Sequence, residues 1–121
     1  MKTGDLIGPL VKPPITTKQL VMYAGACGDF NPIHYDKDFA AAGGYKSVIA
    51  HGMLSMAFFG QLLSKVQVKK ISTRFKAVTY PGDVVTVTGE VISVDGNSAE
   101  VKLVAKVGET VTLEGAATIE F

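Results

Sequence analysis

The chain has 121 residues, of which 47% are hydrophobic and 19% are charged. This length suits one domain with one core, here residues 1–121, and the composition argues against disorder. The formal net charge of +1 gives no reason to expect nucleic acid or an anionic membrane as a partner. Cys27 is the only cysteine, which excludes an intrachain disulfide and a cysteine-rich zinc site.

The composition of the apolar stretches predicts a soluble protein. The N-terminal residues lack an apolar run of signal-peptide length, and the most apolar stretch, Met53 to Leu63, is shorter than the ~18 to 20 residues that span a bilayer. A single cysteine also suits a reducing compartment. We therefore expect a cytoplasmic location.

A first helix is predicted after Pro13-Pro14, where Thr16 and Gln19 have the spacing of a capping box. Hydrophobic residues then repeat at i, i+3, i+4 and i+7, namely Leu20, Tyr23, Ala24 and Cys27. This spacing predicts one buried stripe, with Cys27 as a small buried hydrophobic residue. Gly28 stands where a helix ends.

A loop and a short helix follow. Pro32 disfavours helical dihedrals at Asn31, so the segment from Asp29 to His34 is predicted to be a loop. Asp36 can then cap a short helix, which Gly43-Gly44 ends.

A second long helix is predicted from about His51 to Lys65. Its apolar residues cover nearly every face, which is typical of a helix buried on all sides. We expect it to be the central helix of the fold.

From Lys70 onward hydrophobic residues alternate with polar ones, which indicates β-strands. Turn signals at Pro81-Gly82-Asp83, Asp95-Gly96-Asn97 and Gly108-Glu109 divide this region into four strands. Short connections favour an antiparallel meander with one polar face. The predicted class is therefore α+β, with an antiparallel sheet curled around the apolar helix.

Three motifs carry a family resemblance. They are the stretch Tyr23 to His34 followed by Ala40, the stretch Ile49 to Leu54, and Arg74-Phe75 followed by Pro81-Gly82-Asp83. In order and spacing they resemble MaoC-like hot dog proteins, which are (R)-specific enoyl-CoA hydratases and (3R)-hydroxyacyl-ACP dehydratases of fatty acid metabolism. The resemblance implies a hydro-lyase that uses no metal or redox cofactor. It also implies a CoA-bound or ACP-bound substrate and a homodimer, or a heterodimer with a related subunit.

The resemblance assigns water activation to Asp29 and His34. Hydration of a 2-enoyl thioester needs one group that takes a proton from water and one that delivers a proton to the α-carbon. A carboxylate and an imidazole can both transfer protons, and they have different pKa values. Asn31 either orients one of the two or closes the loop by local bonding.

Gly52 is the candidate for an oxyanion-binding amide. At a helix start the backbone N–H groups lack intrahelical acceptors, and a residue without a Cβ allows close approach. The resemblance points to the same amide. His51, Met53 and Ser55 are further substrate-binding candidates, although a histidine at this place is more often a structural residue bonded to the backbone.

Two other functions remain open from the sequence. His34-Tyr35-Asp36 with His51 has the residue order of the facial triad of non-haem iron oxygenases. The fold would also permit a thioesterase or a non-catalytic acyl-thioester-binding protein. A basic cluster can meet CoA phosphates or an acidic carrier protein, or simply form a solvated strand face; it consists of Lys65, Lys69, Lys70, Arg74 and Lys76.

Overall fold

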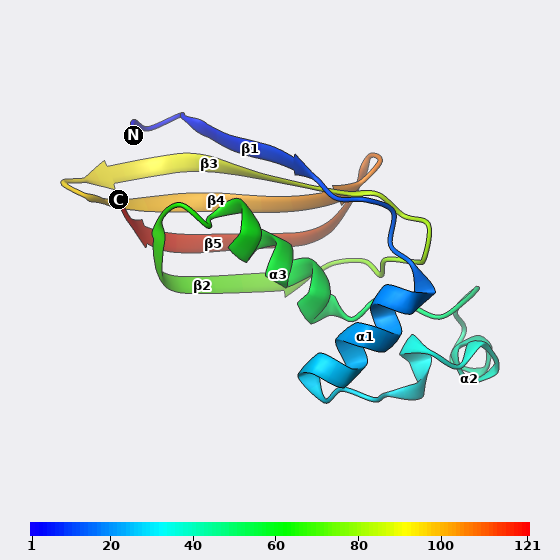
Figure 1. Cartoon of the computed structure of the whole chain (residues 1–121). Helices are drawn as coiled ribbons and strands as arrows, with labels where there is room; N and C mark the ends of the chain where they lie inside the picture. Colours follow the sequence, from blue (N-terminus) through cyan, green and yellow to red (C-terminus); the bar gives the residue numbers. More distant parts are fainter.

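The computed structural model describes all 121 residues as an antiparallel sheet wrapped around one helix, α3 (Figure 1). The strands are β1 (Leu6–Val11), β2 (Gln67–Phe75), β3 (Val85–Asp95), β4 (Ser98–Val107) and β5 (Thr110–Glu120). The helices are α1 (Thr17–Cys27), the 3₁₀ turn η1 (Pro32–His34), α2 (Lys37–Ala42) and α3 (Gly52–Leu62). The predicted α+β class is confirmed.

The helix ends follow the local signals in the sequence. The Thr16 side chain accepts a hydrogen bond from the Gln19 amide, and Gly28 ends α1 with a φ of 76°, a left-handed conformation that glycine adopts without a Cβ clash. The Asp36 carboxylate accepts from the amides of Asp38 and Phe39 and so caps α2. The burial of Cys27 was predicted wrongly, because the last turn of α1 leaves this residue exposed.

The strand order is β1-β3-β4-β5-β2, with every neighbouring pair antiparallel. The strands β3, β4 and β5 form the expected meander. The prediction that β2 belongs to the same meander was wrong, since β2 pairs with β5. Residues 76–84 are too long for a tight hairpin, and they carry the chain across the end of the sheet to β3. The lead-in residues add a fifth strand, β1, beside β3.

The core lies between α3 and the concave face of the sheet (Figure 1). Leu54, Phe58 and Phe59 of α3 are buried against side chains on one face of β3, β4 and β5. These side chains are Val85, Val87, Val91, Val101, Leu103, Ala105, Leu113, Ala117 and Ile119. Burial on all sides of α3 was predicted wrongly, because the sheet covers only one side of the helix and Met53 on the other side is 55% exposed. None of the helices combines the length and apolar character needed to cross a bilayer.

Candidate active site

The loop between α1 and η1 is folded by its own side chains. The Asp29 carboxylate accepts a hydrogen bond from the Asn31 amide through Oδ1, at 3.2 Å. The Asn31 side chain in turn accepts from the Ile33 amide, also at 3.2 Å, and Pro32 begins η1. Of the two roles considered for Asn31, local loop closure is the one that these contacts support.

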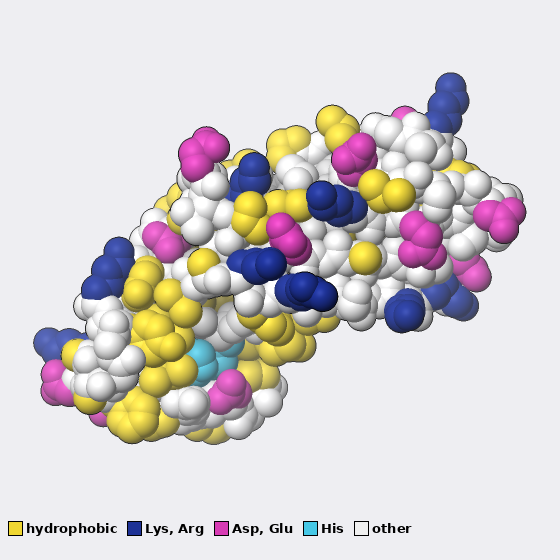
Figure 2. Space-filling model, turned by 180° about the vertical axis from the view of Figure 1, so that it is seen from behind, with side chains coloured by type: hydrophobic (Ala, Val, Ile, Leu, Met, Phe, Trp, Pro, Cys, Tyr) yellow, Lys and Arg dark blue, Asp and Glu magenta, His cyan; other side chains and the backbone are white.

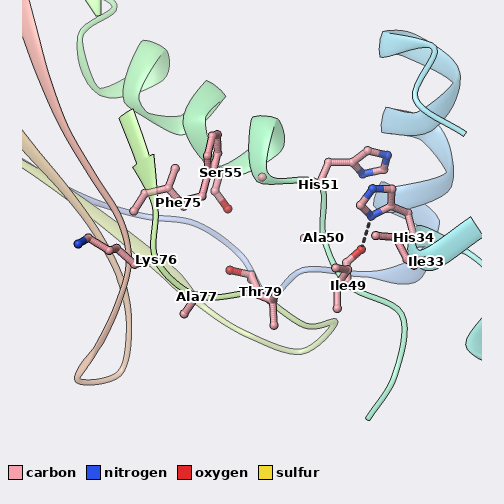
Figure 3. Close-up of a pocket in the computed structure, with 13 residues that line it drawn as sticks. Ile33, His34, Ile49, Ala50, His51, Ser55, Phe75, Lys76, Ala77 and Thr79 are labelled. Carbon is pink, nitrogen blue, oxygen red and sulfur yellow. Dashed lines mark hydrogen bonds between the residues drawn. The ribbon is translucent and has the colours of Figure 1, made fainter. Parts of the chain in front are cut away.

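His34 is buried and lies with its imidazole at the edge of a cavity (Figure 3). Its Nδ1 is 2.7 Å from the carbonyl oxygen of Ile49, so Nδ1 carries the hydrogen and donates it. In the neutral ring Nε2 is therefore the acceptor. Nε2 lies 3.7 Å from Oδ2 of Asp29, whose side chain is 55% exposed. The two groups face each other without a direct hydrogen bond.

His51 contacts both members of this pair. Its Nε2 donates to the backbone carbonyl of Asp29 at 3.1 Å, which confirms the prediction of a backbone-bonded histidine. Its ring stacks on His34 with centroids 3.6 Å apart and an interplanar angle of 18°, and Tyr23 of α1 packs against it edge-on. Nδ1 of His51 is buried without a hydrogen-bond partner.

The protonation of this cluster is shaped by burial. Burial lowers the pKa of His51, and the neighbouring His34 lowers it further, whereas the hydrogen bond to Asp29 opposes the shift. Burial also raises the pKa of Tyr23, with the nearby Cys27 and Asp29 acting in the same direction. Both shifts favour neutral side chains beside His34.

The start of α3 lies next to the two histidines. His51 is the N-cap residue, and its side chain makes no capping hydrogen bond. The first backbone amide of α3 that donates a hydrogen bond is that of Leu54, whose acceptor is the His51 carbonyl. The amides of Gly52 and Met53 therefore have no acceptor in the helix. A Cβ on Gly52 would lie 2.8 Å from the Phe75 ring, so only glycine fits beneath that ring as it stands.

A cavity of about 380 Å³ opens beside these groups (Figure 3). Its lining comes from η1, the start of α3, the end of β2 with the residues that follow it, and β5; it consists of Ile33, His34, Ile49, Ala50, His51, Gly52, Ser55, Phe75, Lys76, Ala77, Val78, Thr79 and Leu113. Among the candidates from the sequence, His34, His51, Gly52 and Ser55 line it, whereas Asp29, Asn31 and Met53 do not.

Two buried hydroxyl side chains also line this cavity. Ser55 and Thr79 point their oxygens into it from opposite walls (Figure 3). Sequence reasoning did not single out Thr79, and no local signal marks it, because it lies in the irregular connection after β2. Phe75 was noted only as part of a motif, and its place over Gly52 follows from the pairing of β2 with β5.

The residues present do not fit the iron triad. The carboxylate of Asp36 caps α2, and the acidic residue near the two histidines is Asp29 instead, with ligand atoms of the three residues within 4.8 Å of one another. The stacked rings keep the free nitrogens in nearly parallel planes. An ion at the usual ~2.0 to 2.2 Å from both nitrogens would lie outside both ring planes, which in-plane lone pairs do not permit.

Comparison with known proteins places the chain in a family. A family model described as MaoC like domain matches residues 5–113, so the chain belongs to this family. The (R)-specific enoyl-CoA hydratase of Rhodospirillum rubrum is 34% identical over 117 residues, which are 87% of this chain and 78% of that protein. Enoyl-CoA hydratase ChsH3 of Mycobacterium tuberculosis is 39% identical over 84 residues, 64% of this chain. This chain spans only 29% of the length of ChsH3.

Solved structures agree with this assignment. The (R)-hydratase from A. caviae involved in PHA biosynthesis superposes with a TM-score of 0.93 at 26% identity, over 100% of this chain and 97% of that chain. The predicted hot dog fold is thereby confirmed. The ChsH1-ChsH2 complex from Mycobacterium tuberculosis contains a chain of the same fold, with a TM-score of 0.90 at 22% identity over 98% of this chain and 97% of that chain.

Proposed function

We propose that this protein reversibly hydrates trans-2-enoyl thioesters to (3R)-3-hydroxyacyl thioesters. The observation that carries the proposal is the pair of acceptor atoms, Nε2 of His34 and Oδ2 of Asp29, which face each other at 3.7 Å. His34 lies on the wall of the cavity, and Asp29 lies next to it on the exposed loop. Both atoms accept hydrogen bonds, so one water on their open side can donate to both. Family membership and the named activities of the relatives support the same reaction.

Water activation follows from the hydrogen-bond geometry. The water donates one hydrogen to His34 and the other to Asp29, which directs its oxygen toward C3 of the substrate. As the new C–O bond forms at C3, the pair accepts one proton from the water, and the pair then delivers one proton to C2. The substrate gains one water molecule, and the pair returns to its starting protonation state.

The start of α3 stabilises the charge that develops on the thioester oxygen. The free amide of Gly52 and the positive end of the helix dipole favour an enolate-like oxygen at this place. Gly52, His34 and His51 all line the cavity, which supports a pose with the thioester carbonyl at the Gly52 amide and the reacting carbons beside His34.

The carrier is CoA or an acyl carrier protein, and the basic cluster at β2 suits the phosphates of either. Within this cluster Lys69 pairs with Glu120 at 3.7 Å, and Lys76, which lines the cavity, is 3.9 Å from Glu114. These exposed pairs are weak enough to yield to a phosphate. The proposed mechanism uses no redox cofactor, because hydration is not a redox reaction, and it uses no metal, because Asp29, His34 and the Gly52 amide supply the proton transfer and the charge stabilisation.

The active form is a dimer, either of this chain or with a related subunit. Hydrophobic side chains gather around the histidines on the surface in Figure 2, and Phe30, Met53 and Phe75 are all more than half exposed. The Asp29 carboxylate is open to solvent in the single chain, and β1 and β2 are unpaired edges. A second subunit on this face would exclude bulk water from the pair. A fully active monomer in sedimentation experiments would contradict the dimer.

The function is tested with enoyl thioesters of several chain lengths on both CoA and acyl carrier protein. Loss of the enoyl absorbance without release of free thiol is expected, with the (3R) alcohol as the product. Release of thiol would identify the alternative function, a thioesterase. Mainly (3S) product would show that the assignment of the reacting face is wrong, and binding without turnover would identify a non-catalytic acyl-binding protein.

A further inference from the structure

Asp29 and His34 do not bond to each other, so other residues must hold them in place. Their nearest atoms are 3.7 Å apart, which is beyond hydrogen-bond distance. His34 is tied to the segment before α3 by its bond to Ile49, and the backbones of Ile33 and Ile49 are also bonded. Asp29 makes no backbone–backbone hydrogen bond, and its carboxylate accepts only from the Asn31 backbone amide within its own loop.

We infer that His51 is a positioning residue that holds Asp29 and His34 at their working separation, an inference that rests on the proposed hydration. One side chain makes both contacts: Nε2 donates to the Asp29 carbonyl at 3.1 Å, and the ring stacks on His34 at 3.6 Å. The hydrogen bond ties the exposed loop to the start of α3. The stack fixes the orientation of the His34 ring, and thereby the direction in which its Nε2 faces Asp29.

His51 is itself held rigidly enough to serve this purpose. It is 2% exposed, it is the N-cap residue of α3, and Tyr23 of α1 packs on its edge with centroids 4.9 Å apart. Two consecutive segments, α1 and the loop that follows it, therefore meet the more distant start of α3 at this ring. An active-site geometry needs such support, because a misplacement of ~1 Å costs on the order of 10²-fold in rate.

The surroundings also keep His51 uncharged. The titratable groups that face it are Tyr23 from α1, His34 from η1 and Asp29 from the loop, with Cys27 near Tyr23. A proton on Nδ1 would have no acceptor, because this atom is buried without a partner. A neutral ring can stack on His34 in either protonation state of His34, whereas a charged one would repel protonated His34. The proton that moves during the reaction is therefore carried by His34 and Asp29, and His51 does not take it up.

Two substitutions separate the two contacts. His51→Gln keeps an amide donor within reach of the Asp29 carbonyl but removes the ring, and His51→Phe keeps a ring for stacking but removes the donor. We expect kcat to fall about 10-fold in each and on the order of 10²-fold in His51→Ala, with KM for the enoyl thioester changed less than about 3-fold. Val91→Ala, in the core of β3, is the control for lost stability and should keep kcat.

A second readout does not depend on activity. Backbone NMR order parameters of residues 29–31 should fall in His51→Phe and stay at the wild-type value in Val91→Ala. Unchanged order parameters together with unchanged kcat in all three His51 variants would overturn the inference. A raised KM at constant kcat would also overturn it, by making His51 a substrate-binding residue. If the wild type hydrates no thioester, the proposed function fails, and the order parameters alone decide the role of His51.

Discussion

The packed sheet with α3 and the segment from Gly28 to Gly52 are built in different ways. In the first region, β3, β4 and β5 pair along nearly their whole length, with one register shift in each pairing, and the buried side chains of α3 share one cluster with them. The second region has short helical turns, and a few bonds between side chains and the backbone supplement their own backbone bonds. These side chains are Asp29, Asn31, His34, Asp36 and His51. Stability is thus distributed over many contacts in the sheet, whereas the geometry of the site depends on a few.

This difference predicts that substitutions in the two regions have different consequences. In the core they should lower the free energy of unfolding with little effect on the chemistry of the remaining folded protein. In the site segment they should lower turnover while the fold survives. The following predictions test that separation, from the largest expected effect to the smallest.

Phe59→Ala should have the largest effect. The ring is fully buried between α3 and the sheet, and truncation of a buried phenylalanine costs roughly 3 to 5 kcal/mol in the free energy of unfolding. Urea denaturation measures this loss. The control is Ile92→Ala on β3, which is about half exposed and should change stability by less than ~0.5 kcal/mol. Equal effects of the two substitutions would contradict the assigned core.

Asp29→Asn and His34→Ala should each lower turnover by at least ~10²-fold, equivalent to ~2.7 kcal/mol of activation free energy. Steady-state kinetics measures the loss, and circular dichroism should show that both variants keep the fold. Because the two groups act on one water, the double variant should lose much less than the product of the single losses. Multiplicative losses would mean that they act in separate steps.

Asp36→Ala should affect stability more than chemistry. The carboxylate caps α2, and loss of an N-cap costs on the order of 1 kcal/mol. Asp36→Asn retains a good capping group and is the matched control, with stability close to wild type. Turnover should fall less than ~10-fold in both, far below the loss at Asp29. If Asp36→Asn were as damaging as Asp29→Asn, or a chelator abolished turnover, an iron site would replace the proposed pair.

The smallest predicted effect is a pH dependence of stability that comes from His51. Because burial lowers the pKa of this residue in the folded state, the unfolded chain binds the proton more readily. The folded state should therefore lose stability as the pH falls below the unfolded value of ~6.5. Unfolding curves between about pH 7.5 and 5.5 would reveal this slope, which should be smaller in His51→Gln. An identical slope in the variant would assign the effect to other groups.

Much of the site could be predicted from local sequence patterns. The cap at Asp36 and the start of α3 near Gly52 are confirmed, because each depends on residues within a few positions of one another. The predicted loop from Asp29 to His34 is confirmed only as far as Asn31, since Pro32–His34 form the 3₁₀ turn η1. Cys27 illustrates the limit of the same reasoning. Its spacing matches the buried stripe of α1, but at the last turn of the helix nothing in the rest of the chain covers it.

By itself, the sequence determined the long helices, the four strands after α3 and the residue types of the site, since hydrophobic period, capping and turn preferences are short-range properties of the chain. It did not determine β1, which is a strand because it pairs with β3. Only the tertiary structure decided how distant segments meet. It paired β2 with β5, which brought Phe75 over Gly52 and Thr79 into the cavity, and it stacked His51 on His34 while bonding it to Asp29. Such contacts depend on which buried surfaces pack best across the whole domain. A local pattern is compatible with several of these arrangements, and packing selects one.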